Sequence, residues 1–180
     1  MRTTLRRQRK SIPPTIQKRA AQRLAQLAFR CAALRHARRV AVYLSMGSEL
    51  ATQPLIAALR SRRIAVFAPA MLHGQMGFRA LGHAGLQVHR LGMLQPRCGA
   101  ALRASAMDVV ILPLLGFDAR GTRLGQGGGH YDRALSKAAF RPYRLGLAYA
   151  VQQINTLPRE PWDVPLHAVL TERGLRRFAR

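Results

Sequence analysis

The sequence is poor in acidic residues. It has 7 Asp and Glu against 30 Lys and Arg in 180 residues, for a formal net charge of +23. Most of this charge is arginine, and it is spread along the whole chain. One interpretation is a nucleic-acid-associated protein held by phosphate contacts, with a purely structural glycine loop. The other is a set of solvated arginines whose field attracts small anionic substrates. Either way, we expect nonspecific adsorption to nucleic acid at low salt.

Cysteines, aromatic residues and long apolar runs are also scarce. Cys31 and Cys98 provide neither a disulfide framework nor the spacing of a metal site, so a reducing compartment is the default. Aromatic residues make up 6% of the chain, and neither an RNA-binding aromatic signature nor a zinc finger is present. No apolar run is long enough to span a membrane. The basic start MRTTLRRQRKSIPP lacks the apolar stretch of a secretory signal, although an Arg-rich start also fits a mitochondrial transit peptide. We predict a cytoplasmic, monomeric protein with no membrane partner.

What is present is a regular alternation of helical and strand-like patterns. Helical spacing predicts helices over 2–10, 15–33, 52–60 and 130–139, and apolar runs predict strands over 40–45, 64–68, 109–112, 144–149 and 167–171. Thr15 is the expected N-cap of the second helix, and Pro69 is expected to end the second strand. The short pieces 76–81 and 86–89 suggest an edge hairpin. This alternation predicts one α/β layered domain with a mainly parallel sheet.

A glycine-dense loop lies between a predicted strand and a predicted helix. Val109–Leu112 is followed by Pro113, then by Gly125 and Gly127–Gly129, and then by the helix that starts at His130. Glycines let a ligand approach backbone amides, and the N–H groups of a helix start attract anions. This arrangement is typical of a phosphate cradle, although a flexible surface loop would also be glycine-rich. The spacing matches neither the Walker motif nor the dinucleotide-binding fingerprint.

The same stretch, FDxxGxRLGxGGGxYDRxL, resembles the signature of the 5-formyltetrahydrofolate cyclo-ligase family, without a gap from Phe117 to Leu135. The resemblance implies a three-layer Rossmann-like domain over 1–180, with N-terminal helices in 1–33 and the strand, phosphate loop and helix start in 108–135. It implies an ADP-forming ligase that uses ATP and Mg²⁺ to cyclise the reduced folate 5-formyltetrahydrofolate to 5,10-methenyltetrahydrofolate through a phosphorylated formyl intermediate.

The resemblance also implies roles for individual residues. The start RTTLR matches a basic helix that contacts ATP phosphates, the segment Met46 to Thr52 matches a folate-binding loop, and Asp163 matches a magnesium ligand. The ATP-binding set would be Arg2, Arg6, Gly125, Gln126, Gly127, Gly128, Gly129, His130, Tyr131, Asp132 and Arg133. The folate-binding set would be Met46, Glu49, Thr52, Gly128 and Tyr131. The catalytic set would be Arg6, Arg123 and Asp132, and the metal ligands would be Asp132 and Asp163.

Several of these residues have simpler explanations. The arginines of 2–10 would suit a solvated helix face, Glu49 would suit a helix start, and Tyr131 would suit a core. The chain also departs from the family pattern, since Gln95 replaces the usual Glu of a Gly-x-x-Glu-Pro element and His167 replaces a second acidic residue. We expect His167 to be a satisfied histidine and not a metal ligand. These departures leave open an ATP-using relative with a different substrate.

Overall fold

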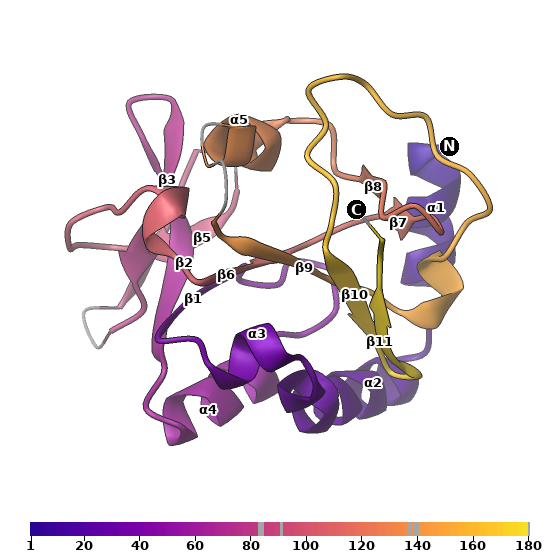
Figure 1. The fold of residues 1–180 in the computed structure, drawn as a ribbon, viewed down its shortest axis with the longest axis horizontal. Helices are drawn as coiled ribbons and strands as arrows, with labels where there is room; N and C mark the ends of the chain where they lie inside the picture. Colours follow the sequence, from indigo (N-terminus) through magenta and orange to yellow (C-terminus); the bar gives the residue numbers. More distant parts are fainter. Residues whose placement is uncertain (83–84, 91, 137, 139–140, 180) are drawn as a thin grey trace.

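A seven-stranded sheet forms the centre of the computed structural model, which describes residues 1–82, 85–90, 92–136, 138 and 141–179 (Figure 1). In spatial order its strands are β11 (Gly174–Arg177), β10 (Ala168–Thr171), β9 (Tyr143–Leu147), β6 (Val109–Leu112), β1 (Arg39–Val42), β2 (Ala65–Leu72) and β3 (Gln75–Ala80). Every neighbouring pair from β10 to β2 is parallel, and β3 and β11 close the two edges in the antiparallel sense. The predicted mainly parallel sheet is confirmed.

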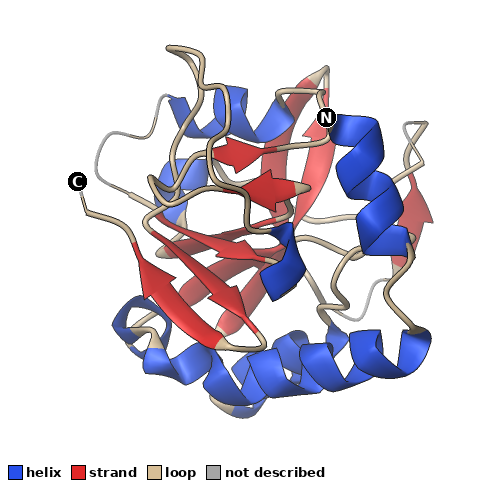
Figure 2. Ribbon diagram, turned by 90° about the vertical axis from the view of Figure 1, so that its right-hand side faces the viewer, coloured by secondary structure: helices blue, strands red, loops and turns tan. Residues whose placement is uncertain are grey.

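Helices lie on both faces of this sheet. α2 (Pro14–Leu27), α3 (Ala32–Arg35) and α4 (Gln53–Ser61) cover one face, below the sheet in Figure 1. α5 (His130–Ser136) and a short turn at Ala104–Ala106 lie on the other face, and α1 (Arg2–Lys10) stands at one end. Figure 2 shows the same layers from the side, with strands between the long helices at the bottom and a helix at the top. The arrangement is the three-layer α/β domain that the sequence predicts.

The central strands are apolar on both sides because both sides are covered. Val40 and Val42 pack against the α2–α4 layer, whereas Ala41 and Val110 pack on the opposite face, beneath Leu135 of α5. Successive side chains of a strand point to opposite faces, so a strand buried on both faces needs a continuous apolar run. This explains why runs such as VVIL were recognisable as strands without alternating polarity.

The predicted hairpin between 76–81 and 86–89 is wrong. β3 pairs with β2, and β4 (Leu86–Val88) pairs with β5 (Leu94–Pro96) in a separate two-stranded sheet. The connection from β2 to β3 is a tight turn in which His73 and Gly74 have positive φ angles of 46° and 79°. Two such residues match the twist of paired strands, so this short turn joins β2 to β3.

The sequence predicts that Pro69 ends its strand, and this prediction is wrong. Pro69 lies inside β2, opposite Phe78. Phe78 directs its own N–H and carbonyl to Leu102, on the far side of β3, so it requires no donor from Pro69. The ladder between β1 and β2 has already ended at the Ala41–Phe67 pair. A proline is tolerated here because neither neighbouring strand needs its missing N–H.

Helix boundaries also differ from the prediction. α2 starts at Pro14 with Pro13 in the N-cap position, so Thr15 lies inside the helix and is not its cap. Proline is favoured in the first helical turn, where no N–H is needed. The predicted helix 15–33 is divided, because α2 ends at Leu27 and a turn at Ala28–Arg30 precedes α3. α5 ends at Ser136; positions 137 and 139 of the predicted helix lie outside the described residues.

The order of the parallel strands points to one place for a ligand. Across the sheet they follow the order β2, β1, β6, β9 and β10, so the chain first adds β2 on one side of β1 and then all later strands on the other. Open α/β sheets bind ligands beyond the carboxyl ends of the strands where this order reverses. Here that point lies between β1 and β6, where the segments that follow Val42 and Leu112 meet.

Candidate active site

A cavity of about 620 Å³ opens beside the glycine loop that follows β6. Its volume is in the usual range for a small-molecule site. The predicted residues that line it are Arg2, Arg123, Gly125, Gln126, Gly127, Gly128, Gly129, His130, Tyr131, Asp132 and Asp163. Met1, Pro113 and Leu124 also line it. The sequence did not point to the other lining residues, which are Met76, Met93, Pro158, Glu160 and Trp162. Residues from six separate segments therefore meet at one cavity.

Two positions of the loop have to be glycine, one because of its backbone conformation and one because a side chain would collide with a neighbouring residue. Gly127 has a φ of 110°, which a side chain rarely allows. At Gly128 a Cβ atom would lie 2.8 Å from Cδ2 of the His130 ring. The loop therefore keeps its backbone amides accessible to the cavity only as long as these positions have no side chain.

Helix α1 is joined to the glycine loop by arginines. Arg2 donates from Nε to the carbonyl of Gly125 at 3.3 Å, and Arg6 donates from Nη2 to Oε1 of Gln126 at 3.0 Å. Gln126 in turn donates from Nε2 to Oε1 of Glu49 at 3.2 Å. Arg6 and Glu49 do not line the cavity themselves, but this chain of hydrogen bonds connects both of them to it through Gln126.

The centre of the site is an ion pair between Arg123 and Asp132. Nη2 of Arg123 lies 2.6 Å from Oδ1 of Asp132, and the two side chains are 5% and 18% exposed. Oδ1 also accepts the N–H of Val164 at 3.3 Å. Within the described residues, the buried Nε of Arg123 has no hydrogen-bond partner. An orphaned donor on an arginine that lines a cavity is a natural partner for an anionic ligand.

Two carboxylates of this cavity suit a magnesium ion. Asp163 uses Oδ2 to accept the N–H of Glu160 at 2.9 Å, and Asp132 uses Oδ1 as described above. In the described part of the chain, no hydrogen bond reaches the other oxygen of either carboxylate. No group of three or more His, Cys, Asp or Glu is placed to hold a metal among those residues. One or two carboxylates with phosphate oxygens is how Mg²⁺ is usually held, so these residues fit the ion.

The loop after β1 holds Glu49 but does not expose Thr52. Oε2 of Glu49 accepts the N–H of Met46 at 3.0 Å, which fixes the carboxylate above the end of β1. Thr52 is fully buried, and its hydroxyl donates to the carbonyl of Tyr43 at 2.9 Å. The hydroxyl of Thr52 thus serves the backbone of the loop, and its contact with a substrate stays a prediction. Met46 is 41% exposed and does not line the cavity.

Arg9 is a site-forming residue that the sequence did not identify. It is 5% exposed and donates to Oγ of Ser48 at 3.2 Å and to the carbonyl of Leu114 at 3.3 Å. Burial lowers its pKa, and nearby Glu49 partly opposes that shift. Arg9 thereby ties α1 to the loops that follow β1 and β6. Its position four residues after buried Leu5, on the inner face of α1, was the only available signal.

Tyr131 and His130 keep their neutral forms. Burial raises the pKa of Tyr131, and the negative charge of Glu49 adds to the shift. Burial lowers the pKa of His130, and the neighbouring charge of Arg133 adds to that effect. Nη2 of Arg133 lies 3.1 Å from Nδ1 of His130 and donates to the carbonyl of Gly128 at 2.7 Å. Arg133 thus stiffens the glycine loop from outside the main cavity.

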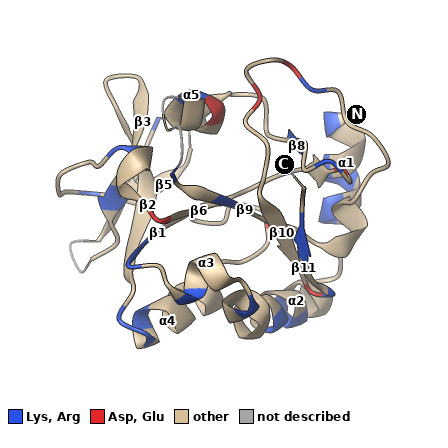
Figure 3. Cartoon of the chain, viewed as in Figure 1, with Lys and Arg blue, Asp and Glu red and all other residues tan. Residues whose placement is uncertain are grey.

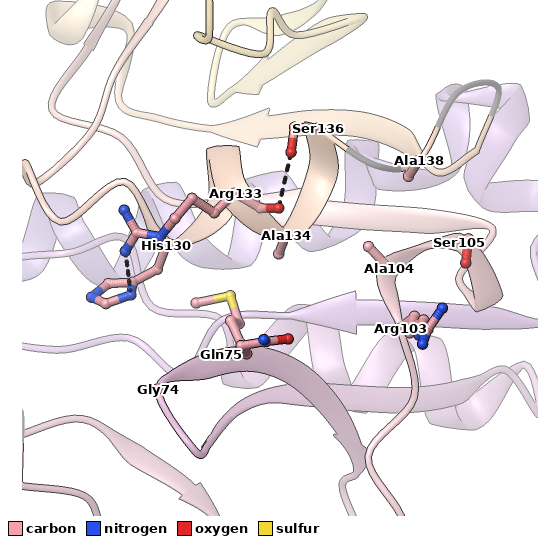
Figure 4. Close-up of a pocket in the computed structure, with 11 residues that line it drawn as sticks. Gly74, Gln75, Arg103, Ala104, Ser105, His130, Arg133, Ala134, Ser136 and Ala138 are labelled. Atoms are coloured by element: carbon pink, nitrogen blue, oxygen red, sulfur yellow. Dashed lines mark hydrogen bonds between the residues drawn. The ribbon is translucent and has the colours of Figure 1, made fainter.

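A second cavity, of about 450 Å³, lies on the other side of α5 (Figure 4). Its charged lining residues are Arg103 and Arg133, together with the titratable His130. Figure 4 shows α5 above the cavity, Gly74 below it and Arg103 beside Ser105. It shares Met76 and His130 with the main cavity, so the positively charged wall continues past the glycine loop.

The two departures from the family pattern lie away from the main cavity. Gln95 is buried, and its Oε1 accepts the N–H of Met71 at 2.9 Å, so it holds β5 against β2. Nδ1 of His167 accepts the N–H of Arg144 at 2.8 Å, and its ring stacks on Tyr143 with centroids 4.7 Å apart. His167 is satisfied by these contacts, as the sequence predicts.

A doubly wound α/β domain in which a glycine loop, arginines and two carboxylates line one cavity is typical of an enzyme that handles a phosphorylated substrate. The model of the 5-formyltetrahydrofolate cyclo-ligase family matches residues 1–172. The chain therefore belongs to this family of ligases.

Individual relatives agree with that assignment. A 5-formyltetrahydrofolate cyclo-ligase of Haemophilus influenzae is 34% identical over 179 residues, covering 94% of this chain and 95% of the relative. The protein of the same name from Escherichia coli K12 is 36% identical over 175 residues, covering 93% and 96%. The solved 5,10-methenyltetrahydrofolate synthetase of Aquifex aeolicus has the same fold, with a TM-score of 0.87 at 24% identity over 99% of this chain and 91% of its own. In the part of the chain that the structure describes, we find no helix of the length and apolarity needed to cross a membrane.

Proposed function

We propose that this chain cyclises 5-formyltetrahydrofolate to 5,10-methenyltetrahydrofolate and converts ATP to ADP and phosphate in the same reaction. The observation that carries the proposal is the convergence of the glycine loop, the Arg123–Asp132 pair and Asp163 on one cavity beside the α1 arginines. Relatives that align over nearly the whole chain have the name of this activity.

The reaction needs a way to remove an amide oxygen. The formyl oxygen on N5 of the folate is a poor leaving group. Transfer of the γ-phosphoryl group from ATP to this oxygen forms an O–P bond, releases ADP and leaves an iminium phosphate. N10 then attacks the formyl carbon, which closes the five-membered ring, and loses its proton. Departure of phosphate breaks the C–O bond and leaves the methenyl C=N bond. As in other phosphoryl transfers, the protein mainly positions groups and neutralises charge.

The glycine loop and its arginines would bind the phosphates of ATP. Gly125–Gly129 line the cavity and would offer their backbone amides, and Arg2 lines it from α1. Arg6 lies one hydrogen bond away, on Gln126, and would turn to the phosphates when ATP occupies the loop. Arg123, with its unpartnered Nε, would stabilise charge on the group in transfer.

Asp132 and Asp163 would hold the magnesium ion. When bound, Mg²⁺ would neutralise phosphate charge and act as a Lewis acid. The ion pair with Arg123 keeps the carboxylate of Asp132 in place at the cavity wall. The N–H of Glu160 orients Asp163 in the same way.

The reduced folate would lie with its pterin ring against Glu49. A carboxylate accepts two adjacent N–H donors, which the pterin ring offers. Met46 and Gln126 already hold Glu49 by hydrogen bonds, so its orientation does not depend on the ligand. Tyr131 would pack against the folate from the start of α5.

A direct assay tests the proposal. Purified protein, 5-formyltetrahydrofolate and MgATP should give the absorbance of the methenyl product, and the same mixture without ATP should not. A flat trace from folded protein that binds ATP would instead indicate a relative with a different substrate. A flat trace without ATP binding would contradict the nucleotide site itself.

Glu49→Gln tests the assignment of the folate pocket. We expect its KM for the folate to rise about tenfold or more, because a charged hydrogen-bond acceptor is lost. Its KM for ATP should change little. The reverse order of effects would place Glu49 on the nucleotide side.

A further inference from the structure

The helical layer below the sheet is uniformly basic. Its three helices and the Ala28–Arg30 turn contain no acidic residue. The exposed cations of this layer include Lys18, Arg19, Arg23, Arg30, Arg35 and Arg60. Figure 3 shows Lys and Arg on α2, α3 and α4, along one side of the molecule. We call this surface the α2–α4 face.

The few acidic residues of the chain are occupied elsewhere. Asp118 and Asp108 accept backbone N–H groups from Thr122 and Arg39, and Glu172 accepts that of Ala150. The other four acids are Asp132 of α5 and, in the loops around the active site, Glu49, Glu160 and Asp163. None of the seven acidic residues belongs to α2, α3, α4 or the Ala28–Arg30 turn, so every charged residue of the α2–α4 face is a cation.

This face lies on the other side of the sheet from α5 and the glycine loop (Figure 1). Its helices pack on the sheet through their apolar sides, such as Leu24 of α2 and Leu55 of α4, and present their basic sides outward. A ligand bound there would leave the active-site cavity open, so the two sites would act independently.

The side chains of the α2–α4 face indicate which kind of polyanion it would bind. Ile16 is its one exposed large apolar residue among those that the structure describes, which is too little for insertion into a lipid surface. Phe29 is covered by the guanidinium of Arg62 at 3.8 Å, so no free aromatic ring offers a base-stacking platform for a single strand. Arginines without apolar or aromatic partners suit a regular array of phosphates.

We propose that the α2–α4 face docks double-stranded nucleic acid through its phosphate backbone, without reading the bases. α2 has 14 residues and spans about 21 Å, or about six base pairs of duplex. Arg19 and Arg23 are four residues apart, on one side of this helix, and both are exposed. They are placed to contact neighbouring phosphates of one backbone.

A pair of matched double variants tests this proposal. Arg19→Ala with Arg23→Ala removes two cations from α2 and keeps a good helix former at both positions. Arg90→Ala with Arg97→Ala removes the same charge from two exposed positions in the region of β4 and β5. Binding of the full-length proteins to a labelled duplex of about 20 base pairs is measured by fluorescence anisotropy over a range of NaCl concentrations. A single strand of equal length and anionic phosphatidylglycerol vesicles serve as competitors.

The α2 pair should weaken duplex binding about tenfold at low salt and lower the salt slope by about 1.8, since each phosphate contact contributes about 0.9. The Arg90 and Arg97 pair should change affinity less than about threefold, and folate turnover should be unchanged in both variants. Equal effects of the two pairs would overturn the proposal in favour of diffuse charge. Tighter binding of the single strand or of the vesicles would also overturn it, as would no duplex binding at low salt.

Discussion

At the scale of single residues, the site depends on charges that are paired before any ligand arrives. Arg123 is nearly buried and its partner Asp132 is in hydrogen-bond contact, so each holds the other at the cavity wall. Asp132 thus has two roles, as the partner of Arg123 and as the proposed magnesium ligand. A variant that keeps the shape of the Asp132 side chain but removes its charge tests both roles.

Asp132→Asn should lower kcat about a hundredfold or more, because the amide is a poor ligand for Mg²⁺ and Arg123 loses its counter-charge. Steady-state kinetics over a range of Mg²⁺ concentrations measures the effect. Glu160→Gln is the matched control, since Glu160 lines the same cavity and has no proposed role in the reaction. Wild-type activity in Asp132→Asn would remove Asp132 from the metal site.

Asp118 is a second carboxylate of the family signature, and its role is structural. It is fully buried and accepts N–H groups from Arg120, Thr122 and Leu157 at 2.9 to 3.2 Å. Burial alone would raise the pKa of Asp118, but these hydrogen bonds outweigh it and hold the pKa below the usual value of 3.8. The ionised form therefore stabilises the fold above about pH 4, and this stabilisation is lost as the pH falls through the lowered pKa.

Asp118→Asn should lower the free energy of unfolding at pH 7 by about 1 to 3 kcal/mol, because its NH₂ group would face backbone donors. Urea unfolding from pH 7 down to about pH 3 measures this. The wild type should lose stability at the acid end, and the variant should lose less over the same range. Parallel curves for the two proteins would contradict the lowered pKa of Asp118.

At the scale of elements, close packing of the strands and loops decides which glycines are replaceable. Gly146 lies in β9, where a Cβ atom would come within 2.8 Å of Leu114 and of Leu166. Both leucines are buried, so neither has free space to move into. The segment after β6 therefore depends on the absence of a side chain in the neighbouring strand.

Gly146→Ala should destabilise the protein by about 1 to 3 kcal/mol through overpacking. Gly82→Ala is the control, because a Cβ atom there would contact nothing within 4 Å and its φ is not in the positive range. We expect the control to be neutral or slightly stabilising. Thermal unfolding compares the two, and an equal midpoint for both variants would show that the leucines move aside.

At the scale of the whole molecule, ion pairs offset only a small part of the repulsion among cations. Three ion pairs are present in the described part of the chain, against a net charge of +23. Two of them involve arginines whose side chains are 62% and 70% exposed, and such pairs contribute little. Added salt therefore screens more repulsion than attraction.

The midpoint of thermal unfolding should rise when NaCl is increased from about 20 mM to about 300 mM, as the Debye length shortens. KCl should act in the same way, since the effect depends on ionic strength. The Arg19→Ala and Arg23→Ala variant should show a smaller rise, because it has less repulsion to screen. A midpoint that falls with salt would mean that attractive pairs dominate.

The sequence alone determined the layered α/β class and the central strands, because these depend on local patterns. Val109–Leu112 was recognisable as a buried strand, and its predicted bounds are those of β6. The glycine loop and the Asp132 motif were recognisable because the residues of the family signature lie close together in the sequence. Where a feature depends on what a segment packs against, local patterns failed, as at Pro69 and at the expected hairpin of 76–81 with 86–89.

Only the tertiary structure decided how distant segments combine. Arg9 looked like one more solvated arginine, but the fold buries it between the loops after β1 and β6. The sequence suggested Thr52 as a substrate contact, but its hydroxyl donates to the backbone carbonyl of Tyr43. The physical reason is the same in both cases. The environment of a polar side chain is set by partners that are far away in the chain, and only the folded arrangement brings those partners within hydrogen-bond distance.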